Sequence, residues 1–455
     1  MAKSKTVWVC QNCGAESPKW IGRCPVCGEW NTYVEEIITK PSGKKSGANM
    51  TSSGPPRPLA SVESMTHRRI ITGTGEFNRI LGGGIVPGTL VLLGGEPGIG
   101  KSTLALQVCL QLASSTLYIS GEESAEQIKL RANRMGLPQD HTLIYPETRY
   151  EFIADQIRRI SPSLVVIDSI QTITTEKIES SAGSVSQVRE CAGKFLSLAK
   201  QTGIPILLIG HITKEGTLAG PKILEHIVDV VLHFEGDPKF LFRILRVLKN
   251  RFGSTSELAL FEMKENGLAE ITNPSELLLS HLDDTLSGIA TASTIDGIRP
   301  FLIETQALVS TAVYGTPQRT STGFDIRRLH MLLAVLEKRA GFRLSARDVF
   351  LNIAGGLKVE DPGIDLAVTA SVLSSYLDVP VPESMAFAAE IGLSGEVRPV
   401  ARIEQRIGEA AKLGFNKMMI SGYNARKLNL QKMPLTIIPV KKMEEVIKYL
   451  FNQKT

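Results

Sequence analysis

The feature that most constrains this chain is a glycine-rich segment, GEPGIGKST, at residues 95–103. Gly95, Gly100, Lys101 and Ser102 occupy every fixed position of the pattern G-x-x-x-x-G-K-[ST]. The apolar run TLVLLGG precedes the segment, and TLALQVCLQLA, which has helical periodicity, follows it. The sequence therefore predicts a strand, a phosphate-binding loop and a helix in the order that binds a nucleoside triphosphate.

Each part of the loop has a predicted role. Its glycines let backbone N–H groups turn toward the phosphates, and the helix N-terminus adds its dipole. We expect Lys101 to reach the outer phosphates and the Ser102 hydroxyl to ligate Mg²⁺. The predicted nucleotide-binding residues are Gly95, Glu96, Pro97, Gly98, Ile99, Gly100, Lys101, Ser102 and Thr103.

A second acidic position supports a metal–nucleotide site. Strand and helix patterns alternate from residue 59 to 270, which predicts a mainly parallel sheet covered on both faces. One expected strand, Leu164 to Asp168, has four apolar residues followed by an aspartate. A carboxylate at that strand end is placed to hold the water shell of Mg²⁺.

Hydrolysis also needs a group that activates water. The strand TLYIS runs into GEES, so Glu122 and Glu123 follow a neighbouring strand. We expect Glu122, ahead of Glu123, to be the catalytic carboxylate. The alternative is an acidic first turn of a helix, which the helix dipole favours without any catalytic role.

Two further segments are candidates for coupling nucleotide to a polyanion. The first follows the strand PILLIG and contains His211, Thr213, Lys214 and Lys222, near the ligand edge of the sheet. The second is KNRFG, comprising Lys249, Asn250, Arg251, Phe252 and Gly253. Arg251 is placed either to reach a neighbouring subunit's nucleotide or, with Lys249, to pair with DNA phosphates while Phe252 stacks on a base.

The cysteines predict a metal site near the N-terminus. Cys10, Cys13, Cys24 and Cys27 form two C-x-x-C pairs separated by ten residues, which is typical of tetrahedral zinc. A disulfide framework is the alternative, but the basic N-terminus lacks the apolar region of an export signal. We expect a cytoplasmic protein with no membrane segment, because no apolar run reaches about 18 residues.

Together these residues resemble the bacterial RadA (Sms) recombination ATPases, which are relatives of RecA. The zinc module, GEPGIGKST, GEES, LVVIDSIQT, GHITKEG and above all KNRFG carry the resemblance, which covers essentially the whole chain. It implies a RecA-like core in hexameric rings, DNA-stimulated ATP hydrolysis and remodelling of branched DNA by movement along single strands. It also implies that Lys101 and Asp168 serve phosphate and Mg²⁺, that Glu122 activates water, and that Lys249 and Arg251 couple nucleotide to DNA.

The last third resembles the proteolytic domain of Lon, which uses a serine and lysine dyad. In this sequence the place of the serine falls on Ile364 or Asp365, and that of the lysine on Glu404, so we expect no peptidase activity. A basic surface there has candidate phosphate contacts, although a solvated face explains them equally well. They are Arg299, Arg319, Arg327, Arg328, Lys338, Arg339, Arg343 and Arg347.

The expected fold class is α/β, with a RecA-like P-loop ATPase core, a small zinc module and a Lon-protease-like α/β domain. The expected boundaries are residues 1–34 for the zinc module, 35–58 for a linker, 59–270 for the core, 271–286 for a second linker and 287–455 for the last domain. Expected ligands are ATP, Mg²⁺, Zn²⁺ and single-stranded or branched DNA, with a RecA-type recombinase as a further partner. A clock or signalling ATPase of the same core family and an ATP-dependent protease regulator remain alternatives.

Overall fold

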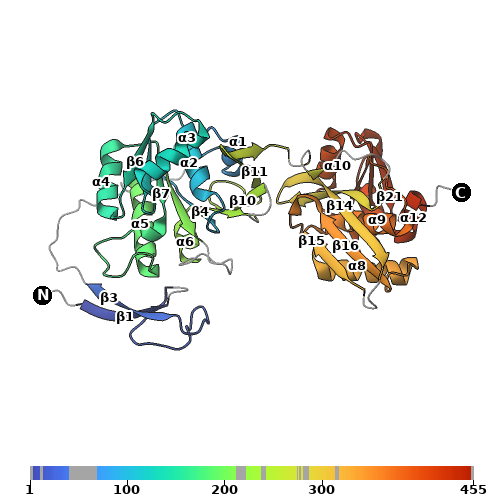
Figure 1. Cartoon of the computed structure of the whole chain (residues 1–455), viewed down its shortest axis with the longest axis horizontal. Coiled ribbons are helices and arrows are strands. Elements are labelled where there is room, and N and C mark those ends of the chain that lie inside the picture. The colour runs from blue at the N-terminus through green and yellow to red at the C-terminus, as the bar shows by residue number, and fades with distance from the viewer. Residues whose placement is uncertain are drawn as a thin grey trace, which may run out of the picture. The chain divides into compact units, whose positions relative to one another are not determined.

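The structure is a computed structural model. It describes residues 4–10, 14–39, 69–211, 222–236, 242–273, 275, 278–279, 286–312 and 317–451. The chain divides into two compact units, Met1–Ile271 and Thr272–Thr455 (Figure 1). The division falls one residue beyond the boundary expected after residue 270.

The N-terminal module is a small antiparallel sheet. Its strands are β1 (Ser4–Cys10), β2 (Glu16–Ser17) and β3 (Tyr33–Thr39), in the order β2-β1-β3. Cys10, Cys24 and Tyr33 form its buried centre. Because β3 pairs with β1 along its full length, ordered structure continues past residue 34, where the linker was expected to begin.

The core of the first unit is a nine-stranded sheet in the order β12-β11-β10-β9-β4-β8-β7-β5-β6. Its strands from β9 to β6 are parallel, while β10, β11 and β12 continue it as an antiparallel extension. The bounds are β4 (Leu90–Gly95), β5 (Thr116–Ser120), β6 (Thr142–Pro146), β7 (Leu164–Asp168), β8 (Ile206–His211), β9 (Val230–Glu235), β10 (Phe242–Asn250), β11 (Leu258–Lys264) and β12 (Gly267–Ile271).

Helices cover both faces of this sheet, as predicted for a parallel arrangement. One face packs against α1 (Gly75–Ile80), α2 (Lys101–Gln111) and α3 (Ala125–Met135). The other packs against α4 (Tyr150–Ile160), α5 (Val185–Thr202) and α6 (Lys222–Ile227).

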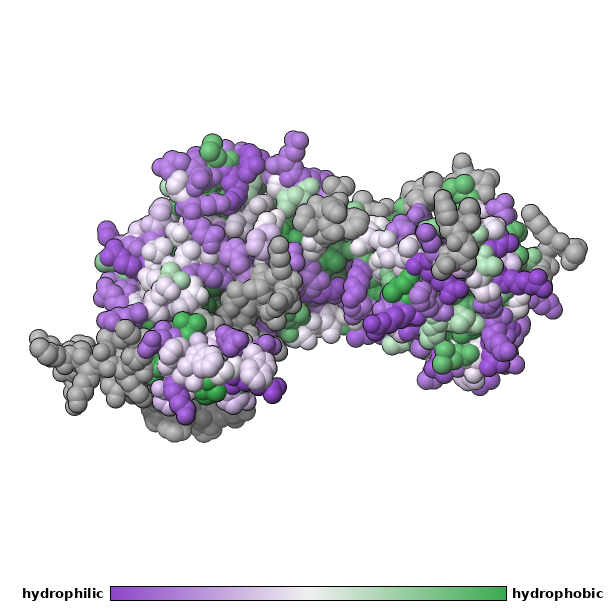
Figure 2. Space-filling model, turned by 60° about the horizontal axis from the view of Figure 1, so that its bottom comes forward, coloured by the Kyte–Doolittle hydropathy of each residue, from purple (hydrophilic) through white to green (hydrophobic). Residues whose placement is uncertain are grey.

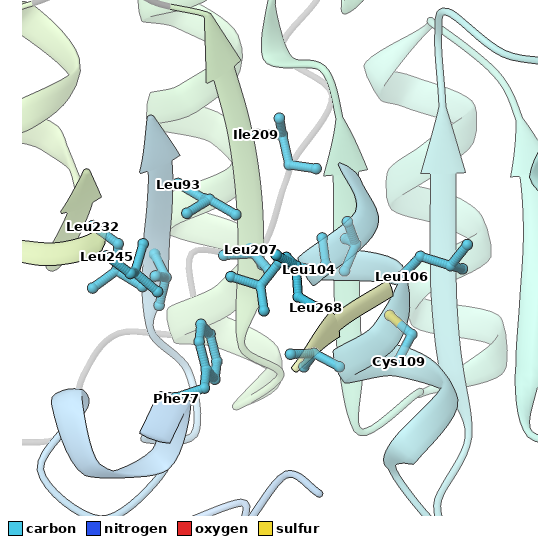
Figure 3. Packing of buried hydrophobic residues seen from close by; sticks show 14 of the residues in the cluster. Phe77, Leu93, Leu104, Leu106, Cys109, Leu207, Ile209, Leu232, Leu245 and Leu268 are labelled. Carbon is cyan, nitrogen blue, oxygen red and sulfur yellow. The ribbon is translucent and has the colours of Figure 1, made fainter. Parts of the chain in front are cut away.

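Successive side chains of each strand point to opposite faces of the sheet, so the same strands contribute to a hydrophobic core on each face. Leu93 and Leu207 point toward α2, while Leu92 and Leu208 belong to the cluster on the opposite face. Figure 3 shows Leu93, Leu207 and Leu104 packed between the strands and α2. This packing fixes the start of α2 at the carboxyl edge of β4, which is where the glycine-rich loop lies.

The second unit has a seven-stranded sheet in the order β15-β16-β14-β13-β17-β20-β21 and a two-stranded sheet of β18 and β19. Its strands are β13 (Ile289–Asp296), β14 (Arg299–Thr311), β15 (Arg319–Thr322), β16 (Arg347–Ile353), β17 (Met385–Ala388), β18 (Glu390–Ile391), β19 (Val397–Arg398), β20 (Lys417–Ser421) and β21 (Thr436–Val440). Its helices are α8 (Ile326–Ala340), α9 (Asp365–Leu377), α10 (Ile403–Lys412), α11 (Gly422–Ala425) and α12 (Met443–Phe451).

Among the described residues on the face drawn in Figure 2, purple hydrophilic residues alternate with small separate groups of green hydrophobic ones. Within the described residues, none of the helices has the length and apolar character needed to cross a bilayer.

Candidate nucleotide site and associated motifs

The loop from Gly95 to Gly100 joins β4 to α2 as the sequence predicts. Gly98 and Gly100 have φ values of +77° and +111°, which side chains other than glycine rarely adopt. At Gly95 a β-carbon would lie 2.6 Å from the carbonyl oxygen of Phe234 on β9. Backbone geometry at these positions and contact with the next strand therefore explain the glycines.

The N-terminus of α2 lies where the sequence predicts an anion site. Gly100 is its N-cap residue and no side chain caps the helix there. The first backbone N–H groups are thus left for a phosphate. Lys101 is 4% exposed, and its Nζ donates to the carbonyl oxygens of Gly95 and Glu96, each at 2.8 Å.

Burial lowers the pKa of Lys101 to about 8, and the carboxylates of Asp168, Glu122 and Glu96 act in the opposite direction. The ammonium therefore lies in a partly desolvated position among negative charges. A bound phosphate would add to the same stabilisation of the charged form.

Asp168 lies at the end of β7 and is 6% exposed. Tyr118 Oη on β5 donates to its Oδ2 at 2.5 Å. Burial raises the pKa of Asp168, while hydrogen bonding by Tyr118 and the nearby Ser102 hydroxyl acts to lower it. A carboxylate beside the Ser102 hydroxyl supplies oxygen ligands of the kind that Mg²⁺ prefers.

Glu122 and Glu123 have different surroundings. Glu122 Oε1 accepts a hydrogen bond from Ser169 Oγ at 2.5 Å and lies 3.2 Å from His211 Nε2. Glu123 instead pairs with Arg131 of α3, and its backbone N–H donates to Ser120 Oγ at 3.0 Å. Glu122 therefore faces the ends of β7 and β8, whereas the carboxylate of Glu123 is held against α3.

His211 ends β8 and lies at the same edge as Glu122. Gln171, in the short 3₁₀ turn Ile170–Thr172 after β7, donates from Nε2 to the His211 carbonyl oxygen at 3.5 Å. Among the described residues, His211 Nδ1 and Gln171 Oε1 are buried atoms without a hydrogen-bond partner. Lys214 and Thr213 lie outside the described residues, and Lys222 begins α6.

The KNRFG segment lies at the opposite end of the central strand from the phosphate loop. Val230 of β9 is beside Val91 near the start of β4, and Asn250 of β10 is beside Val230. The loop leaves β4 at its other end, after Gly95. With about 3.3 Å of rise per strand residue, roughly 15 Å of strand separates the two motifs.

Internal contacts hold much of KNRFG in place. Lys249 Nζ donates to the carbonyl oxygens of Glu225 and Val228 at 2.6 and 2.8 Å, at the end of α6. Burial lowers the pKa of Lys249, and Arg251 acts in the same direction. The Phe252 N–H donates to Asn250 Oδ1 at 2.9 Å, and the Phe252 ring packs against the core of the unit.

Arg251 differs from Lys249 because its side chain is 55% exposed and contacts Asp229 Oδ1 at 3.4 Å. Gly253 packs closely, since a β-carbon there would lie 2.9 Å from Asn250 Nδ2. Arg251 is thus the KNRFG side chain best placed to contact another molecule. The inward contacts of Lys249 and the packing of Phe252 were not apparent from the sequence.

The described cysteines of the N-terminal module converge. The sulfur atoms of Cys10, Cys24 and Cys27 lie within 4.8 Å of one another. Cys13 lies outside the described residues. The Sγ atoms of Cys10 and Cys27 are 3.7 Å apart, which exceeds the 2.05 Å of a disulfide and fits two thiolates at about 2.3 Å from one zinc ion.

Tight turns position these thiolates. The N–H groups of Gly14 and Gly28 donate to the carbonyl oxygens of Cys10 and Cys24 at 2.8 and 2.9 Å, and both glycines have positive φ. The residues therefore fit the zinc site that their spacing predicts.

Comparison with known families agrees with this architecture. Residues 8–35 match the rubredoxin metal binding domain, residues 56–217 match the AAA domain, and residues 305–424 match subunit ChlI of Mg-chelatase. The DNA repair protein RadA of Bacillus subtilis is 51% identical over 430 residues, covering 93% of this chain and 94% of that protein. The chain belongs to the RadA family of DNA repair proteins.

Other RadA relatives match over almost their full length. RadA from Streptococcus pyogenes serotype M6 is 47% identical, covering 99% of this chain and 100% of that protein. RadA from Listeria monocytogenes is 48% identical, with 98% and 99% covered. Two solved structures, a KaiC-like protein from Pyrococcus horikoshii OT3 and the RadB recombinase, are each 23% identical, cover 45% and 44% of this chain and 99% of their own, and have TM-scores of 0.38 and 0.36.

RadA membership and the AAA domain make this chain a DNA repair ATPase with a P-loop. The predicted α/β fold class is confirmed, with a P-loop ATPase core that matches the AAA domain between a zinc module and an α/β unit that matches subunit ChlI. ATP and Mg²⁺ are the cofactors of the ATPase domain, and Zn²⁺ is that of the cysteine module.

The Lon-like unit of this RadA protein has no nucleophile at the expected position. Ile364 and Asp365 are both 0% exposed, and Asp365 accepts from Arg328 Nε at 2.6 Å. Glu404 is exposed on α10. Arg328 was a candidate phosphate contact, but its pairing with Asp365 and the nearby Glu390 gives it a structural role instead.

Several residues at these sites were missed by sequence reasoning. Tyr118 and Ser169 contact the predicted carboxylates, and Asp229 contacts Arg251. Ser169 directly follows Asp168 and was therefore a local candidate. Tyr118 and Asp229 gave no such signal, because their partners lie on other strands or turns of the folded sheet.

Proposed function

We propose that this chain is a DNA-dependent ATPase that binds single-stranded DNA and drives branch migration of recombination intermediates. The observation that supports the proposal most directly is the separation of the two motifs. The candidate nucleotide-binding loop lies at one end of β4, and the exposed Arg251 lies at the other. The full-length similarity to DNA repair proteins is the reason for proposing DNA as the ligand of Arg251.

The proposed hydrolytic roles follow the geometry of the site. Lys101 and the N-terminus of α2 would bind the phosphates, and Ser102 and Asp168 would hold Mg²⁺ with its water shell. Mg²⁺ supplies charge neutralisation at the phosphate oxygens. Glu122 would orient and deprotonate the attacking water, with Ser169 and His211 fixing its carboxylate.

The two neighbouring glutamates provide a matched test of this assignment. Glu122→Gln is expected to keep nucleotide binding and to lower ATP turnover by about 100-fold or more, in line with the loss of a general base. Glu123→Gln removes an equal charge from the adjacent position and is expected to keep most of the turnover. Equal turnover in the two variants would refute the role of Glu122.

KNRFG would act between protomers. Because Arg251 is separated from its own phosphate loop by the length of β4, it would contact either the nucleotide of a neighbouring protomer or DNA. Head-to-tail association into a hexameric ring would bring one protomer's KNRFG to its neighbour's site. Lys214 and His211 would contribute from the segment after β8, and a RecA-type recombinase would be a further partner.

This proposal is tested by measuring ATP turnover with and without single-stranded DNA, together with particle size. The unchanged chain is expected to show DNA-stimulated turnover and to form a ring. Arg251→Ala should keep ATP binding but lose stimulation and branch migration. If single-stranded DNA does not change ATP turnover at low salt, the protein would instead fit a signalling ATPase of the same core family.

We also propose that the Lon-like unit is proteolytically inactive and serves in assembly. The buried Ile364 and the paired Asp365 offer no nucleophile at the position expected for serine. Casein incubated with the protein and ATP is expected to stay intact. Digestion that a serine reagent blocks would overturn this proposal.

A further inference from the structure

A buried carboxylate lies behind KNRFG, where neither the nucleotide site nor the zinc module accounts for it. The side chain of Asp229 is 1% exposed and lies just before β9. A buried charge is costly unless it is paired and hydrogen-bonded. The contacts that stabilise Asp229 therefore indicate what the carboxylate does.

Asp229 connects the strand of the phosphate loop to KNRFG. Its Oδ2 accepts from the backbone N–H of Leu90, the first residue of β4, at 3.1 Å. Its Oδ1 lies 3.4 Å from Arg251 Nη1, and its backbone oxygen accepts from the Arg251 N–H at 3.2 Å. One residue thus holds the start of β4 and the arginine of KNRFG.

A second cation shares the carboxylate. Lys200, near the end of α5, has its Nζ 3.0 Å from Asp229 Oδ2 and 5.8 Å from the centroid of the Phe252 ring. The Arg251 contact is longer, and the Arg251 side chain is the more exposed of the two, at 55% against 49%. Of the two cations, Arg251 is therefore the one whose contact with Asp229 can break at the smaller cost in free energy.

We propose that Asp229 is the positioning residue of Arg251 and that Lys200 is the counter-ion that permits its release. Asp229 holds the guanidinium at the surface in one orientation. When Arg251 moves to a phosphate, Lys200 keeps the buried carboxylate neutralised, so the exchange avoids an unpaired buried charge. The inference rests on the proposed coupling role of Arg251 and specifies how that residue is held.

The first test compares three variants of the full chain: Asp229→Asn, Arg251→Ala and the double variant. Asparagine keeps an acceptor for the Leu90 N–H but loses the charge. The readout is the ratio of ATP turnover with single-stranded DNA to turnover without it. We expect each single variant to lower this ratio by about fivefold or more, which is the lower range of measured coupling between sites.

The double variant distinguishes a positioning role from a merely structural one. If Asp229 acts through Arg251, adding Asp229→Asn to Arg251→Ala will lower the ratio no further. If the two substitutions lower the ratio independently, so that their fold-changes multiply in the double variant, the inference is wrong. A normal ratio in Asp229→Asn beside a lowered ratio in Arg251→Ala would overturn it as well, while leaving the proposed function intact. A normal ratio in Arg251→Ala would contradict the proposed function itself.

The second test does not require a change at the buried position. Lys200→Met leaves Arg251 to neutralise Asp229, so Arg251 should be held more firmly and the stimulation ratio should fall about fivefold. Lys194→Met is the matched control, because Lys194 is on the same helix and pairs with Glu151 at 3.0 Å, away from KNRFG. Indistinguishable ratios in the two variants would refute the role of Lys200.

Discussion

Lys101 shows how burial can make a single side chain sensitive to pH. Its ordinary pKa of 10.5 falls to about 8 in the folded chain because the ammonium is desolvated. Between these values the unfolded chain binds more protons than the folded chain, so this residue makes folding more favourable as pH rises through that window. A bound phosphate favours the protonated form of Lys101, because its negative charge stabilises the ammonium.

Nucleotide affinity is therefore expected to fall as pH rises above about 8, where free Lys101 loses its proton. The affinity of a non-hydrolysable ATP analogue, measured from pH 7 to 9.5, checks this expectation. Lys101→Met should bind the analogue more weakly at every pH and lack the fall. A wild-type affinity that is constant across the range would contradict the prediction.

Tyr118 gives a second prediction at the level of one residue. Its hydroxyl donates to the carboxylate proposed to hold the water shell of Mg²⁺, so Tyr118→Phe removes the hydrogen bond that orients Asp168 without changing the fold of β5. We expect half-maximal turnover to need about tenfold more Mg²⁺, since hydrogen bonds to charged groups contribute about 1.5–3 kcal/mol. Tyr150→Phe is the control, because the Tyr150 hydroxyl donates to the backbone of Lys194 on the opposite face of the sheet. Equal Mg²⁺ requirements would contradict the role of Tyr118.

Among the secondary-structure elements, those with a local sequence signal were predicted best. The strands at β5 and β7 have the bounds expected from their apolar runs. In contrast, β6, β11 and β12 were not predicted, and β10 continues through Lys249 and Asn250 into KNRFG. The strand β6 lies at the edge of the sheet and is only partly buried, although its residues TLIYP contain an apolar run as long as that of TLYIS in β5.

We expect the three-stranded sheet of the zinc module to depend on its metal. Its described buried apolar residues are Val7, Val9, Cys10, Cys24 and Tyr33, with a few partly buried neighbours, which is too little apolar area for independent stability. Cys24→Ser is expected to release zinc and loosen β1 and β3. Elemental analysis and tryptophan fluorescence check both effects, and full zinc retention would contradict the assignment.

At the scale of the whole molecule, the division into Met1–Ile271 and Thr272–Thr455 places the nucleotide site wholly in the first unit. A ligand stabilises the unit that binds it. Calorimetry of the full chain is therefore expected to show an ATP analogue with Mg²⁺ raising the unfolding temperature of one transition while the other stays unchanged. Removing Mg²⁺ should reduce the shift, and an equal shift of both transitions would show that the units unfold together.

The sequence by itself determined the parts whose signal is contiguous. A phosphate loop, two C-x-x-C turns and an apolar strand ending in Asp168 are each specified within a few residues, because backbone geometry and strand periodicity are local. The tertiary structure alone decided that Glu122 faces Ser169 while Glu123 pairs with Arg131, and that Asp229 lies behind Arg251. The contacts of Glu122 with Ser169 and of Asp229 with Arg251 join residues 47 and 22 positions apart, so only the packing of strands and helices brings these side chains together. Glu123 and Arg131 are only eight positions apart, but their pairing depends on how the turn after β5 packs against α3.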